Sequence, residues 1–225
     1  MTRTIFSAVI FMLVSFAQFA QAEEKFDQAS IRLEQNATDK DAEIVFEVTG
    51  NDAGLAALKV TAPDGRIVAD FKAADSKMGF RHVNLESPEP KNDGRVQADF
   101  PAGEYTFTGS TVTGTKLSGK AKLSHKFPGA ASIVQPRADE KGVPVNGLRI
   151  KWNPIKNLSA CLVSIEQEKT DIKLNAKLSG TATSFAVPDG FLTPNTEYKV
   201  AISTVSIDGN VTSVETNFET ASGKK

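Results

Sequence analysis

Cysteine and histidine are scarce in this sequence of 225 residues, and their scarcity excludes several kinds of site. The single cysteine, Cys161, has no second cysteine with which to form a disulfide in the chain. The two histidines, His82 and His125, lie far from each other and from Cys161, without the close spacing of zinc ligands. We therefore expect no metal site, and a fold that depends on its hydrophobic core for stability.

Sequence motifs of catalysis are also missing. The chain has no G-x-S-x-G turn, phosphate-binding loop or H-E-x-x-H pair, and its carboxylates are scattered rather than paired. Asp39-x-Asp41-x-Glu43 is similar to the start of a calcium loop, but Ile44 stands where that loop needs glycine. We expect no catalytic residue and no cofactor, and hence a protein that is not an enzyme.

The chain has no large excess of one charge, with 26 basic and 27 acidic residues, so a dedicated nucleic-acid-binding protein is not expected. After residue 22 no apolar run approaches the roughly 20 residues that a membrane-spanning helix needs. The first 22 residues differ from the rest. Arg3 precedes the apolar residues 5–16, and Ala20-Gln21-Ala22 follows them, which together are typical of a cleaved secretory signal peptide.

Alternating apolar and polar residues dominate positions 23–129 and predict short β-strands. The strands around Leu58 and Ile67 flank Pro63-Asp64-Gly65, which predicts a hairpin. Val96, Ala98 and Phe100 also alternate, and we expect another strand there. Pro128-Gly129 interrupts the pattern and marks the expected boundary between two domains, residues 23–129 and 130–225. The fold class expected is all-β, with two β-sandwich domains in tandem after the signal peptide.

Residues 130–222 resemble a fibronectin type III domain. The resemblance depends on Trp152 in an early strand and on the run Leu192…Pro194-x-Thr196-x-Tyr198-x-Val200. It implies that Tyr198 forms the tyrosine corner of that family, and it implies no catalytic residues. In the first half, the run from Pro101 to Phe107, downstream of the Pro63-Asp64-Gly65 hairpin, is weakly similar to bacterial Ig-like or prealbumin-like modules.

Three residues of the second half are expected to have structural roles. Leu148, Ile150 and Trp152 alternate, so the indole of Trp152 should point into the core rather than serve as a sugar-stacking surface. Cys161 alternates with Val163 and Ile165, which favours a buried, unreactive thiol. Tyr198 takes the tyrosine-corner position that the resemblance implies.

The one candidate binding site is a set of four lysines at even positions, namely Lys116, Lys120, Lys122 and Lys126. The odd positions between them are Leu117, Gly119, Ala121, Leu123 and His125. On a single strand the lysines share the solvent face, where they could contact an anionic glycan of the envelope. Lysines on an edge strand also prevent strand-to-strand aggregation, and this alternative stays open.

We expect an exported binding, adhesion or structural module, secreted or periplasmic, whose partner is an unknown protein or an anionic glycan. An alternative is a non-catalytic accessory subunit that presents an enzyme to a polymeric substrate. A pilus-type periplasmic chaperone is a weaker alternative, because the strand with Leu117 and Leu123 is interrupted by lysines and would donate poorly.

The signal peptide leads to a first prediction. Cleavage after Ala22 should make Glu23 the first residue of the exported protein. Intact-mass measurement of protein recovered outside the cytoplasm should match residues 23–225. A recovered species that retains residues 1–22 would contradict the cleavage site.

Overall fold

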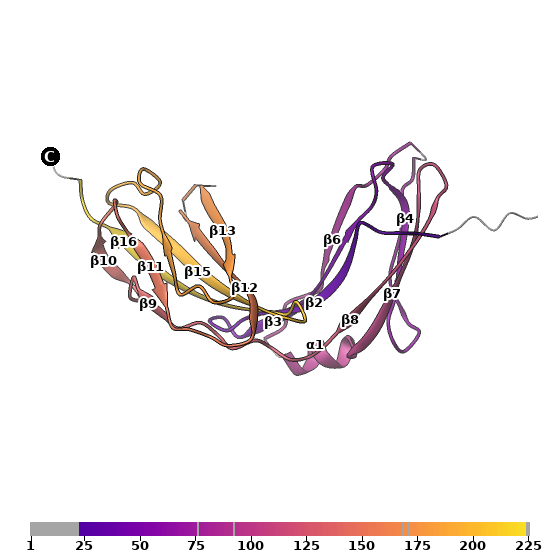
Figure 1. Cartoon of the computed structure of the whole chain (residues 1–225), viewed down its shortest axis with the longest axis horizontal. Coiled ribbons are helices and arrows are strands. Elements are labelled where there is room, and N and C mark those ends of the chain that lie inside the picture. The colour runs from indigo at the N-terminus through magenta and orange to yellow at the C-terminus, as the bar shows by residue number, and fades with distance from the viewer. Residues whose placement is uncertain (1–22, 76, 92, 168, 171, 224–225) are drawn as a thin grey trace, which may run out of the picture.

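The computed structural model describes residues 23–223 except 76, 92, 168 and 171, so the expected signal peptide lies outside the described residues. Most of the described chain is β-strand, and its one helix, α1, spans Asp93–Asp99. No helix in this part of the chain is long and apolar enough to cross a membrane. The strands form two sandwiches in tandem, which confirms the all-β fold class (Figure 1).

The first sandwich consists of a five-stranded sheet in the order β1-β8-β7-β4-β5, packed against β2, β3 and β6. Its strands are β1 (Glu24–Lys25), β2 (Gln28–Asn36), β3 (Asp41–Thr49), β4 (Leu55–Thr61), β5 (Ile67–Lys72), β6 (His82–Glu86), β7 (Gly103–Thr111) and β8 (Lys116–Leu123). β4 and β5 form the hairpin that Pro63-Asp64-Gly65 predicts, closed by the Ala62 N–H, which donates to the Arg66 carbonyl at 2.8 Å.

The second sandwich places the three-stranded sheet β14-β11-β9 against β13-β12-β15-β16, with β10 beside β16. Its strands are β9 (Ile133–Gln135), β10 (Glu140–Val143), β11 (Arg149–Trp152), β12 (Leu158–Glu166), β13 (Lys173–Ser179), β14 (Ser184–Ala186), β15 (Glu197–Ser206) and β16 (Val211–Thr220). This is the fibronectin type III arrangement that the resemblance implies. The Tyr198 hydroxyl accepts a hydrogen bond from the Thr193 N–H at 3.0 Å, which closes the tyrosine corner.

Each sandwich has its own hydrophobic core. Phe46 contacts Tyr105 and Phe107 edge-on in the first core, and Tyr198 stacks on Phe218 in the second. Tyr105 in the first core resembles Tyr198, because its hydroxyl also bonds to the backbone a few residues upstream. It donates to the Pro101 carbonyl at 3.1 Å. Burial raises the pKa of Tyr105 to about 12, so the hydroxyl keeps its proton.

Residues 96–100 are not the strand that their alternation predicts. They belong to α1 and the residue after it, with the Phe100 N–H bonded to the Val96 carbonyl. Val96 is buried and Phe100 packs against the core, whereas Ala98 is exposed. A spacing of four residues returns to the same side in both a helix and a strand, so only the exposure of Ala98 distinguishes the two.

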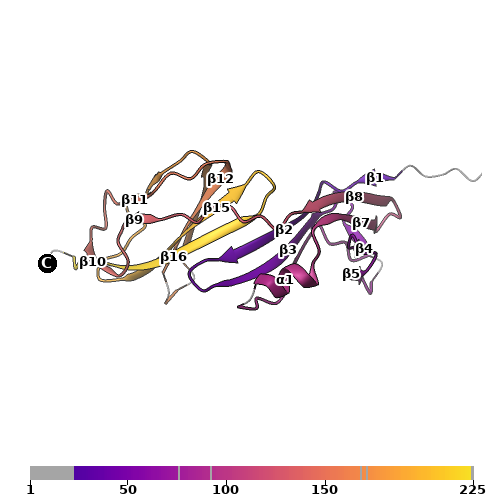
Figure 2. The same ribbon diagram turned by 90° about the horizontal axis from the view of Figure 1, so that it is seen from below.

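The two sandwiches share one sheet. β16 pairs in parallel with β2 through Val211–Glu34, Thr212–Gln35 and Ser213–Asn36. This pairing gives an eight-stranded sheet, in which seven strands follow the order β13-β12-β15-β16-β2-β3-β6 and the eighth, β10, pairs with β16. Figure 2 shows β16 in yellow beside β2 in indigo. In Figure 1 this sheet follows the inner side of a bent molecule, with the sheet of β9 and β11 and the five-stranded sheet at its two outer ends.

Asn210 joins the sandwiches at this junction and is only 1% exposed. Its side-chain oxygen accepts from the Leu33 N–H at 2.9 Å. Its amide nitrogen donates to the carbonyls of Ser124 and Lys126 at 2.8 and 3.1 Å. The hydroxyls of Thr212 and Thr204 continue the junction by donating to the Pro128 and Gly129 carbonyls, each at 2.9 Å.

Asn210→Ala should therefore destabilise the protein. The change leaves the buried Leu33 N–H without a partner, which costs about 1–3 kcal/mol, and it removes the hydrogen bonds to the partly buried carbonyls of Ser124 and Lys126. Chemical denaturation followed by circular dichroism should show a lower free energy of unfolding. Asn175→Ala, on an exposed edge position of β13, is the matched control and should leave it nearly unchanged. Equal stability of the two variants would contradict the role given to Asn210.

Candidate functional site

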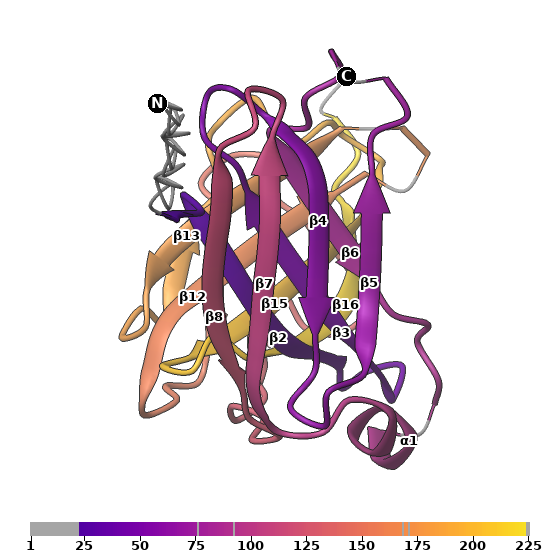
Figure 3. The ribbon, with the colours of Figure 1, turned by 90° about the vertical axis from the view of Figure 1, so that its right-hand side faces the viewer.

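Three of the four candidate lysines lie on the outer face of the five-stranded sheet. Leu117 and Leu123 of β8 are buried in the core, so the alternation of the strand turns Lys116, Lys120 and Lys122 outward, and all three are exposed. Lys126 follows the end of β8 and is also exposed. Figure 3 looks onto this sheet, with β8 near one side of it. We call these four residues the lysine track.

Three hollows follow one another along the lysine track. The first, of about 300 Å³, has Lys116, Lys59, Asp70 and Glu23 in its wall. The second, of about 620 Å³, contains Lys120. The third, of about 770 Å³, contains Lys122 and Lys126. Each of the four lysines therefore lines one hollow, in the order in which it occurs along the chain.

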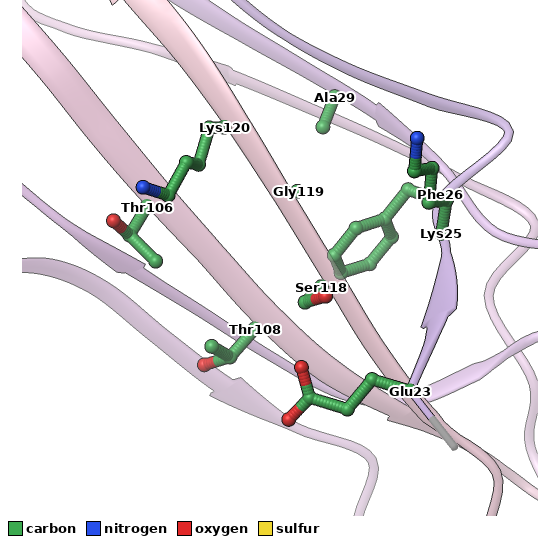
Figure 4. Close-up of a pocket in the computed structure, with 9 residues that line it drawn as sticks. All are labelled: Glu23, Lys25, Phe26, Ala29, Thr106, Thr108, Ser118, Gly119 and Lys120. Carbon is green, nitrogen blue, oxygen red and sulfur yellow. The ribbon is translucent and has the colours of Figure 1, made fainter.

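The second hollow is drawn in Figure 4. Its floor comes from the hydroxyls of Thr106 and Thr108 on β7 and of Ser118 on β8. Lys25 and Phe26, from the start of the chain, form its far side. Hydroxyls beside amines and an aromatic edge supply both the hydrogen bonds and the positive charge that an anionic sugar chain requires.

The second hollow extends across β8 at Gly119, because glycine has no side chain that would fill the space there. A Cβ on Gly119 would lie 3.1 Å from the Ala29 Cβ and 3.2 Å from Cδ2 of Phe26. Larger residues at this position would push against both neighbours. Gly119 therefore keeps the outer face of the sheet continuous with the corner where Phe26 and Ala29 lie.

One of the four track lysines forms an ion pair. Lys120 pairs with Glu104 of β7, with Nζ and Oε1 2.7 Å apart. Lys59 of the first hollow pairs with Asp70 at 3.6 Å. Among the described residues, no ion pair involves Lys116, Lys122 or Lys126. Exposed pairs are weak, so an incoming anion can displace Glu104 from Lys120 at small cost.

The third hollow lies between the sandwiches. Asp208, in the turn before β16, faces it together with His125, whose Nε2 is 2.8 Å from the Phe100 carbonyl. Asp208 also accepts a hydrogen bond from the Ser124 hydroxyl at 3.1 Å. Sequence reasoning missed Asp208, because nothing in a chain pattern places residue 208 beside residue 122. The alternation of Thr106 and Thr108 with buried Tyr105 and Phe107 was a usable signal for the β7 hydroxyls.

The three structural residues lie far from the track, in the second core. Trp152 is 3% exposed and Cys161 is fully buried. Burial raises the pKa of the Cys161 thiol, which the Trp152 indole N–H lowers to a smaller extent. The thiol points at the Ala182 carbonyl, 3.9 Å away. A buried, protonated thiol is a poor nucleophile and a poor metal ligand.

An acidic cluster occupies the other side of the junction, on the shared sheet. Glu34, Asp41, Glu43, Glu89 and Glu215 surround a hollow of about 110 Å³. Within the described ranges, no group of three or more histidine, cysteine or acidic side chains could hold a metal ion. Burial is the main cause that raises the pKa of Glu43 to about 7, and the charges of Glu86, Glu89 and Glu34 raise it further.

No protein-family model and no curated protein matches the sequence. Among solved structures, the chain is similar to a fibronectin type III domain of human collagen XX (19% identity, 42% of this chain and 90% of that chain, TM-score 0.33). It is also similar to a two-domain fibronectin type III segment of chicken tenascin (13% identity, 86% and 100%, TM-score 0.34). Fibronectin(III)-like modules of Clostridium thermocellum CbhA are a third (8% identity, 91% and 93%, TM-score 0.33). At these identities the likeness concerns the fold alone.

Glu43 gives the acidic cluster a testable pH dependence. Its carboxyl ionises at about pH 4.5 in the unfolded chain and at about 7 in the fold, so the folded state loses stability as pH rises from 4.5 to 7. Glu43→Gln should raise the Tm at pH 8 and change it little at pH 4. Glu197→Gln, at an exposed position of β15, controls for the loss of one negative charge. An equal rise in both variants would contradict the assignment to Glu43.

Proposed function

We propose that this protein is an exported, non-catalytic binding module of the cell envelope or extracellular space, and that it holds an anionic glycan along β8. The observation that supports the proposal most is the row of three hollows, each containing at least one lysine of the track. Separate hollows in a line suit successive units of a polymer better than one compact ligand.

The dimensions of β8 agree with an extended ligand. Lys116 and Lys122 are six residues apart on one strand, which corresponds to about 20 Å. The five-stranded sheet provides a floor of hydroxyls between them, and hydroxyls can donate to or accept from a sugar ring. A partner held by exposed lysines binds through screened charges, so its affinity should fall steeply with salt.

The junction favours a second candidate role, that of an accessory subunit. Asn210 and the β16–β2 pairing hold the second sandwich in a fixed relation to the lysine track. A bound polymer would therefore lie at a set angle to whatever the second sandwich contacts. This geometry suits a subunit that presents an enzyme to a polymer, and copurification of a hydrolase with the exported protein would favour it.

The glycan proposal is tested by salt elution from heparin, used as an anionic glycan probe. Lys116→Ser with Lys122→Ser removes two track lysines that form no ion pair with any residue the structure describes. Because each exposed ion pair is worth up to about 1 kcal/mol, binding should weaken roughly five- to tenfold at low salt. The expected result is elution of the variant at clearly lower salt than the parent.

The matched control is Lys156→Ser with Lys177→Ser, which removes the same charge from exposed positions of the second sandwich. It should elute with the parent. Equal weakening by the control, or a parent that elutes as early as the variant, would contradict a glycan track. A parent that does not bind, together with a variant that aggregates, would show that the lysines protect the edge of the sheet.

A further inference from the structure

The first strand of the fold is held to the sheet by very few contacts. β1 pairs with β8 in parallel over two residues only, Glu24 with Leu117 and Lys25 with Ser118. The chain then leaves the five-stranded sheet through Phe26 and Asp27 and enters β2 in the facing sheet. β2 pairs with β3 over its whole length, from Gln28 to Asn36, and this pairing does not involve β1.

Phe26 is the anchor of β1. It is buried in the first core, at a place where the neighbouring strands β7 and β8 each have a glycine. A Cβ on Gly109 would lie 3.0 Å from Cζ of Phe26, and a Cβ on Gly119 would lie 3.2 Å from its Cδ2. The two glycines therefore form a slot into which the phenylalanine ring fits, while the backbone of β1 contributes little.

The segment that joins β1 to β2 is suited to a hinge. Asp27 is exposed and forms a bend between the two strands. β7 pairs with one edge of β8, and β1 pairs with the other edge at Leu117 and Ser118 only. Among the described residues, no strand pairs with the rest of that second edge. A strand that arrives from outside can therefore occupy the place of β1 without displacing any other element.

We propose that two copies of this chain exchange their β1 strands, each placing its Phe26 in the Gly109–Gly119 slot of the other. Within one copy, β1 and Phe26 already occupy this slot. After exchange, the same residues make the same contacts, but with the slot of the other copy. Exchange of such a strand requires a hinge, and mass action favours the exchanged dimer at high protein concentration. In the dimer, the Glu23 and Lys25 that line the hollow at Lys120 come from the second copy.

A cysteine trap tests the exchange in the full chain, purified after export. Lys25 and Ser118 are paired neighbours, so Lys25→Cys with Ser118→Cys can form a disulfide across β1 and β8. The native Cys161 is buried and gives little background. Exchange predicts a disulfide-linked dimer on a non-reducing gel, with a fraction that increases at least severalfold between low and high protein concentration during oxidation.

The matched control is Lys59→Cys with Asp70→Cys, a pair across the β4–β5 hairpin, which exchange leaves within one chain. It should give only an internal disulfide. A Lys25→Cys, Ser118→Cys protein that forms only an internal disulfide at every concentration overturns the proposal. So does the absence of any disulfide in it, or an equal amount of dimer in both variants.

Light scattering of the unmodified chain provides a second test, with Phe26 as the variable. The parent should show the mass of a dimer at high concentration, and Phe26→Leu, which still fills the slot, should keep it. Phe26→Ala empties the slot and should give a monomer. A monomeric parent, or a Phe26→Ala variant that remains a dimer, overturns the exchange. Heparin elution is not a readout here, so the result is independent of the glycan proposal.

Discussion

The arrangement of this protein depends on one buried amide. Asn210 uses its oxygen on the Leu33 N–H and its nitrogen on two carbonyls of the segment after β8, so a single side chain connects β2, the linker and the start of β16. Burying an amide that has all these hydrogen-bond partners costs the folded state little free energy, whereas burying the same amide without them is strongly unfavourable. The parallel pairing of β16 with β2 begins at Val211, the residue directly after Asn210, so the two features hold the same junction.

That constraint extends to the candidate binding surface. The carbonyls that Asn210 holds belong to Ser124 and Lys126, and Lys126 contributes to the third hollow. Asp208, two residues before Asn210, forms the opposite wall of that hollow. The lysine track therefore belongs to the first sandwich, and the second sandwich contributes Asp208 to the hollow at its end. The two sandwiches would not form this hollow together if the linker between them were free.

Charge is distributed unevenly over the two faces of the molecule although its total is nearly balanced. Lysines with few acidic partners lie on the outer face of the five-stranded sheet, while Glu34, Glu43, Glu89 and Glu215 gather on the shared sheet. Burial, and to a smaller extent the like charges around it, raise the pKa of Glu43. The same chain thus presents a basic surface and an acidic one on different sheets.

Pattern alone was sufficient where a residue's position depends on its immediate neighbours. Alternation along β8 predicted that Lys116, Lys120 and Lys122 share a solvent face and that Leu117 and Leu123 lie in the core, because a strand turns successive side chains to opposite sides. The order of landmarks around Trp152 and Tyr198 likewise indicated the fibronectin type III fold. It was not sufficient at residues 96–100, where a helix and a strand share the same apolar spacing.

The tertiary structure decided what depends on distant residues. The ion pair of Lys120 with Glu104, the place of Asp208 beside Lys122, and the slot of Gly109 and Gly119 for Phe26 all join segments that are well separated in the chain. Single-sequence periodicity reports which way a side chain points but not which strand lies next to it. The sequence by itself therefore determined the strands and their buried faces, and the pairing of β16 with β2 decided how the two sandwiches form one molecule.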